Sequence, residues 1–329
     1  MPRAPGTGRA PLARSECERV AQDLVEVEPT GPQADLPRWD LKRGAEIDPS
    51  LVVIEKLGEG TRYEAYRAWD RTLFCETAVK VVRPHRVSDD RAIEGFEREV
   101  TIGMRMTHPY LVRFLRWSAK PPRPYLVMEF VHAQTLGAHL QDVGTVSIPE
   151  TCLLGIRMAG ALQHMHNNSA LHLDVKPYNV TMGDPPKLLD LSLARTFSGP
   201  LKMRHTIGTK EYMPPEQCEY GEVTPQSDLF SLGATLYESV SRMLPFPEGD
   251  EESDSRSDQY PQIEYDALPL SEVIDVPREF EQVVMACLAR DPRRRPDSAI
   301  DVAVLLERVI EGLGLKELLA WPKGVRVRP

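Results

Sequence analysis

One short stretch of this chain combines the polar residues that phosphoryl transfer requires. Asp174, Lys176 and Asn179 follow one another closely, and Asp190 comes eleven positions after Asn179. Transfer of the γ-phosphate of ATP to a hydroxyl needs a group that orients the hydroxyl, a cation that faces the phosphate, and oxygen ligands for Mg²⁺. The spacing therefore predicts Asp174 as the base, Lys176 as the cation, and Asn179 with Asp190 as the metal ligands.

A second set of residues, nearer to the N-terminus, fits the same chemistry. Gly58 and Gly60 lie between two predicted strands, where glycine lets backbone N–H groups approach a phosphate closely. Lys80, in the run Ala78-Val79-Lys80, can then reach the α- and β-phosphates, and Glu99 is the natural anionic partner that fixes its position. Each feature is weak alone, but the ordered set is strong.

The elements that must position these residues are visible in the hydrophobic pattern. We expect strands at 51–57, 64–70, 77–82 and 125–131, and a helix at 91–106 that carries Glu99. The remainder is predicted to be mainly helical, with helices at 151–167, 228–241, 278–289 and 298–312. Strands followed by helices predict an α+β protein with a small β-rich lobe, residues 47–131, and a larger α-helical lobe, residues 132–312.

The two ends of the chain lack the long hydrophobic periods of this central part. Residues 1–46 contain six prolines, which oppose regular structure, so we expect a mostly disordered arm. Residues 15–27 are an exception, because Ser15 and Glu18 form a capping-box pattern and Val20, Leu24 and Val27 share one helical face. Two interpretations stay open here: a nascent helix in a disordered arm, or a helix that docks and regulates, with a possible regulatory partner. Residues 313–329 form a short tail.

Composition excludes several classes of protein. The net charge of -9 argues against a dedicated nucleic-acid binder. Five scattered cysteines without a Cys-x-x-Cys motif predict neither a disulfide framework nor a zinc site, which favours a reducing, cytoplasmic compartment. No apolar run approaches the roughly 20 residues that span a bilayer, so we expect no membrane span.

With these motifs in place, the chain resembles a eukaryotic-like (Hanks-type) serine/threonine protein kinase of the kind common in bacteria. The resemblance runs from about 51 to 313 and includes the glycine loop, Lys80, Glu99 and the segment 172–190. It also includes the following motifs: His108-Pro109, the apolar strand 126–131, Gly208-Thr209 through Pro215-Glu216, Ser227-Asp228, and Asp291-Pro292 through Arg295-Pro296.

This resemblance implies a two-lobed kinase fold that binds ATP and Mg²⁺ and acts on unknown protein substrates. Met128 would be the gatekeeper of the nucleotide pocket, and the backbone from Glu129 to Val131 would hydrogen-bond adenine. Glu216 would pair with Arg295 as scaffold. Further walls of the adenine pocket would come from Leu57, Ala78, Thr181 and Leu189.

The resemblance also implies roles in the segment from Asp190 to Glu216. Thr209 would contact Asp174 and Lys176. Autophosphorylation is expected at Thr206 or Ser198.

Several positions depart from the family pattern. Tyr63 replaces the third loop glycine, and Ala65 replaces the following valine. Leu173 stands where an arginine normally pairs with a phosphorylated loop, which predicts activity independent of that switch. Ser192 replaces a glycine after Asp190. Two further changes weaken supporting contacts: Thr181 replaces the leucine of the pocket floor, and Gly103 replaces an apolar side chain between the lobes.

Two alternative functions stay open at this point. The departures at supporting positions allow a pseudokinase-like scaffold that binds nucleotide or partners without efficient transfer. A kinase-like enzyme that phosphorylates a small molecule is less well supported, because such enzymes generally lack the 208–216 segment and the Arg295 anchor. The acidic stretch 248–258 is either a solvated loop or a docking surface for basic substrates.

Overall fold

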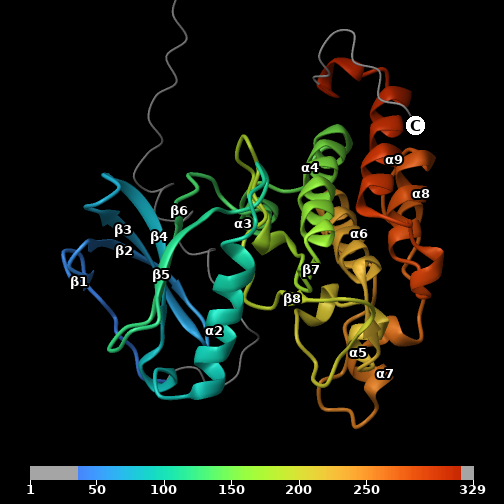
Figure 1. The fold of residues 1–329 in the computed structure, drawn as a ribbon. Coiled ribbons are helices and arrows are strands. Elements are labelled where there is room, and N and C mark those ends of the chain that lie inside the picture. Colours follow the sequence, from blue (N-terminus) through green and yellow to red (C-terminus); the bar gives the residue numbers. More distant parts are fainter. Residues whose placement is uncertain (1–35, 320–329) are drawn as a thin grey trace, which may run out of the picture.

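The computed structural model describes residues 36–319, which form a β-rich lobe and a helical lobe side by side (Figure 1). The small lobe holds an antiparallel sheet with strand order β1-β2-β3-β4-β6-β5. Its elements are β1 (Glu46–Asp48), β2 (Leu51–Glu59), β3 (Tyr63–Asp70), β4 (Cys75–Val82), α2 (Asp90–Gly103), β5 (Phe114–Ser118) and β6 (Tyr125–Glu129).

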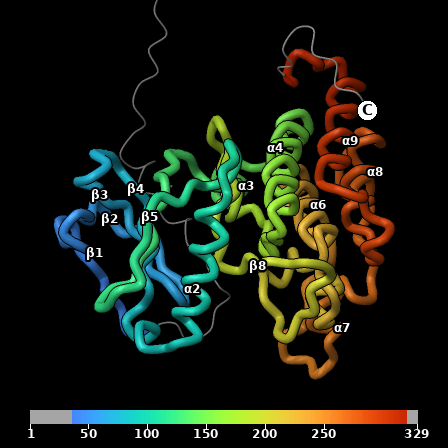
Figure 2. Tube along the Cα trace, in the orientation of Figure 1, coloured from blue at the N-terminus to red at the C-terminus, as the bar shows by residue number. Residues whose placement is uncertain are grey.

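Helix α2 lies between this sheet and the helical lobe, as the backbone trace shows (Figure 2). It begins where the Asp89 side chain accepts hydrogen bonds from the backbone N–H groups of Arg91 and Ala92, which leaves fewer unpaired donors in its first turn. Its buried face includes Phe96 and Val100, and it also carries Glu99 inward. Apolar packing of α2 therefore fixes the position of a carboxylate that the sequence predicted to be functional.

Residues 36–46 pack against the small lobe. The Trp39 backbone N–H donates to Glu64 at 2.7 Å, and its indole N–H donates to the Val82 carbonyl at 2.8 Å. The Leu41 N–H donates to the Tyr66 hydroxyl at 3.1 Å. The end of the predicted arm is thus attached to the sheet, whereas the predicted helix at 15–27 lies outside the described residues.

The large lobe is built around α4, against which α6 and α9 pack (Figure 1). Gly155 in α4 permits this close approach, because a Cβ there would lie 2.6 Å from a Leu306 methyl group. The helices of this lobe are α3 (Leu136–Asp142), α4 (Ile148–Asn167), α5 (Pro215–Cys218), α6 (Pro225–Ser241), α7 (Arg256–Gln259), α8 (Arg278–Cys287) and α9 (Ala299–Gly312). Four two-residue strands form two pairs, β7 (Ala170–Leu171) with β8 (Arg195–Thr196) and β9 (Leu201–Lys202) with β10 (Glu222–Val223).

The predicted two-lobed α+β architecture is confirmed. The long periodic segments are found within a few residues of their predicted bounds, whereas β5 and α3 were not predicted. The chain past α9 continues as a 3-10 turn over Lys316–Leu319. Within the part that the structure describes, no helix has the length and apolar character needed to cross a membrane.

Candidate active site

Three charged side chains from distant parts of the chain meet between the lobes. Lys80 on β4 donates to Glu99 on α2 at 3.0 Å and to Asp190 at 2.5 Å. All three residues are buried, and Lys80 is only 3% exposed. The predicted partnership of Lys80 with Glu99 is confirmed, and the same lysine also holds Asp190.

The two acids that share Lys80 differ in their electrostatic state. Burial raises the pKa of Asp190, but the Lys80 ammonium and the Ser192 N–H more than offset this and hold it well below its ordinary value. Burial raises the pKa of Glu99, and although Lys80 opposes this, the charge of Asp190 adds to it, so the net shift is upward. Asp190 is therefore held ionised near neutral pH, which is the form that binds a metal.

The predicted base and its neighbours form a second cluster. The Asp174 carboxylate accepts hydrogen bonds from the Asn179 amide at 3.0 Å and from the Thr209 hydroxyl at 2.8 Å. The Lys176 ammonium donates to the same Thr209 hydroxyl at 2.6 Å and lies 2.9 Å from Asp174. The expected contacts of Thr209 with Asp174 and Lys176 are confirmed. These bonds fix the carboxylate and the ammonium on one side of the loop.

Asp228 on α6 fixes the backbone of the loop that precedes Asp174. Its carboxylate accepts the backbone N–H of His172 at 3.0 Å and that of Leu173 at 2.8 Å, and it contacts the His166 ring at 2.8 Å. Burial raises the pKa of Asp228, but His166 and these backbone bonds bring it below its ordinary value. The carboxylate stabilises Leu173 at φ +64°, a conformation that is unfavourable for a leucine. Asp228 is thus scaffold.

Two oxygen atoms of this region are free to bind a cation. Asn179 uses its amide nitrogen to contact Asp174, and Asp190 uses Oδ1 to contact Lys80 and Ser192. Within residues 36–319, neither Asn179 Oδ1 nor Asp190 Oδ2 takes part in a hydrogen bond. A carboxylate oxygen and an amide oxygen are hard donors that fit Mg²⁺, which keeps several waters and binds one or two protein ligands.

A small apolar cavity lies between the sheet and Asp190. Seven of the predicted nucleotide-binding residues line it: Leu57, Ala78, Lys80, Met128, Glu129, Val131 and Leu189. Ala65 and Val112 also line it and were not predicted as binding residues. Ala65 was recognisable as the replacement for a family valine, whereas nothing in the local sequence singles out Val112.

The other three predicted nucleotide-binding residues are not part of the lining. Gly58 and Gly60 lie at the end of β2 and just after it. Thr181 is fully buried, and its hydroxyl accepts the Lys187 N–H at 2.8 Å. Its place in the adenine floor stays a prediction.

The missing side chain at Gly103 is replaced from another element. A Cβ on Gly103 would lie 2.2 Å from the ring of Phe114 on β5, so the phenylalanine already occupies that space. Phe114 is 6% exposed. The space that a side chain at position 103 would occupy is therefore filled by the Phe114 ring.

The other departures are also accommodated. Tyr63 packs inward, with its ring centroid 5.4 Å from the Lys80 ammonium, so it forms a wall of the lysine site. The φ of Ser192 is not positive, so this position does not require a glycine. The residue with a positive φ is Asp190, at +51°. Leu173 packs into an apolar cluster that holds part of the loop after Asp190, together with Leu171, Met203 and Val223.

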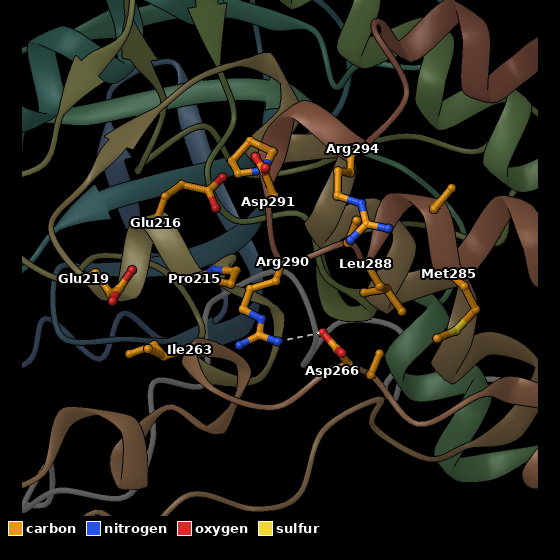
Figure 3. Close-up of a pocket in the computed structure, with 14 residues that line it drawn as sticks. Pro215, Glu216, Glu219, Ile263, Asp266, Met285, Leu288, Arg290, Asp291 and Arg294 are labelled. Carbon is orange, nitrogen blue, oxygen red and sulfur yellow. Dashed lines mark hydrogen bonds and ion pairs between the residues drawn. The ribbon is translucent and has the colours of Figure 1, made fainter.

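The segment before α6 is anchored by the predicted ion pair. Arg295 donates to Glu216 at 2.7 and 2.9 Å, and the Arg295 side chain has no exposed surface. A cavity of about 640 Å³ lies beside this anchor, crossed by an Arg290–Asp266 contact of 3.0 Å (Figure 3). Glu216 lines that cavity, but none of the residues around Lys80 or Asp174 does, so it is separate from the chemistry.

The acidic stretch 248–258 contacts the same segment. Lys210 lies 3.5 Å from Glu251 and donates to the Gly249 carbonyl at 3.1 Å. The Arg256 guanidinium donates to the Thr206 hydroxyl at 2.7 Å and stacks on Tyr220. This stretch is therefore more than a solvated loop, because it braces the residues between Asp190 and Glu216.

Comparison with known proteins adds an independent line of evidence. Residues 51–303 match the family model of the protein kinase domain. PknL of Mycobacterium tuberculosis (strain H37Rv) is 30% identical over 285 residues, which cover 84% of this chain and 70% of PknL. PknB of Mycolicibacterium smegmatis is 31% identical over 269 residues, and PrkC of Bacillus subtilis is 27% identical over 280. These matches cover 78% and 83% of this chain but only 42% of either relative. All three are named serine/threonine-protein kinases.

Proposed function

Because this chain belongs to the protein kinase domain family, we propose that the cluster around Asp174 transfers the γ-phosphate of Mg-ATP to serine and threonine hydroxyls of proteins. The family is that of the protein kinase domain, and the named relatives are serine/threonine-protein kinases. The assignment of each step to a residue, and of Mg²⁺ as the metal, rests on the geometry described above.

One observation carries the proposal most directly. The Thr209 hydroxyl contacts both Asp174, at 2.8 Å, and Lys176, at 2.6 Å. This arrangement presents a carboxylate and an ammonium side by side, as required to orient a substrate hydroxyl and to neutralise charge on the phosphoryl group. Asp174 would receive the hydroxyl proton, and Lys176 would stabilise the charge that spreads over the phosphoryl oxygens.

The residues on the opposite side would position the nucleotide. Lys80, oriented by Glu99, would contact the α- and β-phosphates, and Gly58 and Gly60 would let the loop backbone approach them. Asn179 and Asp190 would hold Mg²⁺ through their free oxygen atoms. When bound, the metal would supply positive charge that offsets the negative charge of the phosphates.

Nucleotide entry would require this cavity to widen. The apolar cavity measures about 20 Å³, which accommodates about one water molecule. Adenine is larger, so the lining side chains or the small lobe would have to move before the base could bind. Such lobe movements occur on the microsecond-to-millisecond timescale and often limit turnover.

Three of the four departures that support the scaffold alternative are accommodated in the described part of the chain. The space at Gly103 is filled by Phe114, Ser192 has no backbone strain, and Leu173 forms an apolar contact in place of a charged one. The small-molecule alternative is also weaker, because the Glu216–Arg295 pair anchors a segment that would receive a protein substrate.

The test is phosphate transfer from labelled Mg-ATP to the chain itself and to a generic basic protein. Asp174→Asn keeps the shape of the side chain and removes the carboxylate, so it should lower the rate at least about 100-fold. ATP-dependent thermal stabilisation serves as the control that the variant still binds nucleotide. Equal transfer by the wild type and the variant would remove Asp174 from the mechanism.

A further inference from the structure

Arginine side chains converge on a cavity of about 200 Å³ beside α2. Its wall includes Val82 and Ser192, and no aspartate or glutamate lines it within residues 36–319. The arginines come from the turn between β2 and β3, from the 3-10 turn Pro84–Arg86, from α2 and from β8; they are Arg62, Arg86, Arg91, Arg98 and Arg195.

Most of these positive charges lack a counter-charge. In the described part of the chain, no carboxylate lies within 4 Å of Arg62, Arg91, Arg98 or Arg195, and only Arg86 has a contact, at 3.5 Å to Asp89. Burial, with the charges of Arg98 and Arg62, lowers the pKa of Arg195 to about 10. Solvent screens part of the repulsion between these guanidinium groups, since Arg91 and Arg98 are exposed, and an anion between them would remove more of it.

A second observation also points to a ligand. Ser192, 8% exposed, lines the cavity, and its hydroxyl has no hydrogen-bond partner among the described residues. A buried hydroxyl without a partner is unfavourable, and an acceptor within the cavity would satisfy it. The cavity therefore combines excess positive charge with an unused donor, which together fit a carboxylate-bearing segment.

The chain itself contains such a segment close by. Residues 15–28 include five acidic residues and a single basic one, Arg19. The first described residues reach the edge of the sheet that borders the cavity, because the Trp39 indole donates to the carbonyl of Val82, a lining residue, while Trp39 itself packs on the face of the sheet opposite α2. Glu28 is eight residues before Leu36, and a chain of that length reaches at most about 26–29 Å. The acidic segment is therefore tethered to the edge of the sheet at which Val82 lines the cavity.

We propose that residues 15–28 bind to the arginine-lined cavity and connect α2 to the segment after Asp190. The carboxylates would neutralise Arg62 and Arg98 and accept a hydrogen bond from the Ser192 hydroxyl. One bound segment would then connect the glycine-loop turn, α2 and β8. The other acidic run, 248–258, is engaged elsewhere, since Lys210 contacts Glu251 and Arg256 contacts Thr206.

The bound segment would favour the arrangement in which Glu99 meets Lys80. Glu99 lies one residue after Arg98 on α2, so a ligand that holds Arg98 limits the movement of the whole helix. This consequence for activity rests on the proposed function, whereas binding of the segment does not. The experiment therefore measures the mobility of α2 and not phosphate transfer.

Hydrogen exchange of the backbone amides of residues 92–103 gives that measurement in the full chain. The chain carries Asp174→Asn throughout, so that it cannot phosphorylate itself and place a phosphate in the cavity. One variant neutralises the segment with Glu16→Gln, Glu18→Gln, Asp23→Asn, Glu26→Gln and Glu28→Gln. We expect exchange in α2 to become at least about fivefold faster, the low end of usual coupling between two sites.

A matched control changes charges of the same arm outside the segment. Arg3→Gln, Arg9→Gln and Arg14→Gln together should leave exchange in α2 unchanged. Arg62→Gln with Arg98→Gln should accelerate exchange like the neutralised segment, and combining both sets should add nothing further. Raising the salt concentration to about 0.5 M should reproduce the effect in the unmodified arm, because screening weakens exposed charge contacts.

Three results would overturn the proposal. The first is unchanged exchange in α2 when the segment is neutralised. The second is an additive effect of the two sets of variants, because the segment would then act at another surface. The third is slow exchange in α2 that appears only after incubation with Mg-ATP and only in a chain that keeps Asp174. The occupant of the cavity would then be a phosphate. Urea unfolding of each variant checks that the folded core is intact.

Discussion

Replacing Gly103 with alanine should destabilise this protein, although the same change in an exposed helix usually stabilises by roughly 0.5–1 kcal/mol. Gly103 is the last residue of α2, and an added Cβ would lie 2.2, 2.3 and 2.7 Å from three ring atoms of Phe114. Contacts this short cannot be tolerated, so either the ring or the end of the helix must move.

The size of the effect follows from two opposing contributions. Overpacking a filled core typically costs about 1–3 kcal/mol. The helix-propensity gain of roughly 0.5–1 kcal/mol offsets part of this. We therefore expect Gly103→Ala to lower the free energy of unfolding by an amount between about 0 and 2.5 kcal/mol and centred near 1 kcal/mol, which is a factor of roughly 5 in the ratio of folded to unfolded chain.

The same helix provides the matched control. Gly95 also lies in α2, but a Cβ there would meet nothing within 4 Å. Gly95→Ala should therefore stabilise by roughly 0.5–1 kcal/mol. Urea unfolding of the full chain measures both variants, and opposite signs are expected for two identical substitutions in one helix.

A double-mutant cycle identifies the cause. In a Phe114→Leu background the ring is absent, so Gly103→Ala should lose most of its penalty, giving a coupling energy of about 1–2 kcal/mol between the two sites. If Gly103→Ala stabilised the chain as much as Gly95→Ala does, the conclusion that Phe114 fills the space at Gly103 would be wrong.

Three further predictions concern the segment between Asp190 and Glu216 and its contacts. Leu173→Ala should lower the free energy of unfolding in urea by about 2–5 kcal/mol, because Leu173 is 1% exposed and packs in an apolar cluster. Glu216→Gln should lower it by about 3–5 kcal/mol, because it leaves the buried Arg295 without its counter-charge. Phosphopeptide mapping after incubation with Mg-ATP should find phosphate at Thr206 or Ser198, and phosphate on Thr206 would gain a charge-assisted hydrogen bond from Arg256.

Each of these has its own control. Val143 is 68% exposed, so Val143→Ala should change stability by less than about 0.5 kcal/mol, and a similar value for Leu173→Ala would contradict its packing role. The control for Glu216→Gln is Arg293→Gln, because Arg293 forms an ion pair with Asp291 while it is highly exposed. This variant should change the free energy of unfolding by less than about 1 kcal/mol. Phosphate found only within residues 1–46 would refute the mapping prediction.

Much of the chemistry could be predicted because it depends on residues close in sequence. Asp174, Lys176 and Asn179 lie in one loop, and their spacing alone places their side chains on the same short segment. The pairing of Lys80 with Glu99 was also predicted from the sequence; α2 carries Glu94, Glu97 and Glu99, and only Glu99 is buried. The expected contacts of Lys80 with Glu99, and of Thr209 with Asp174 and Lys176, are present.

The filled gap at Gly103 was not predictable in this way. A missing side chain can be read from a sequence, but its replacement comes from Phe114 on a different strand, and only packing shows which neighbour enters the space. Likewise, the sequence shows that Leu173 stands where the family carries an arginine. It does not show which side chains Leu173 packs against, because Met203 and Val223 are distant in sequence.

The sequence by itself determined the two-lobed architecture and the set of residues proposed to transfer phosphate, because hydrophobic periods and motif spacing are local properties. Only the tertiary structure decided that Asp190 shares Lys80 with Glu99, that an aromatic ring replaces a side chain at Gly103, and that several arginines surround one cavity beside α2. These features depend on which distant segments meet. Close packing and unpaired charge arise from long-range contacts that no local pattern encodes.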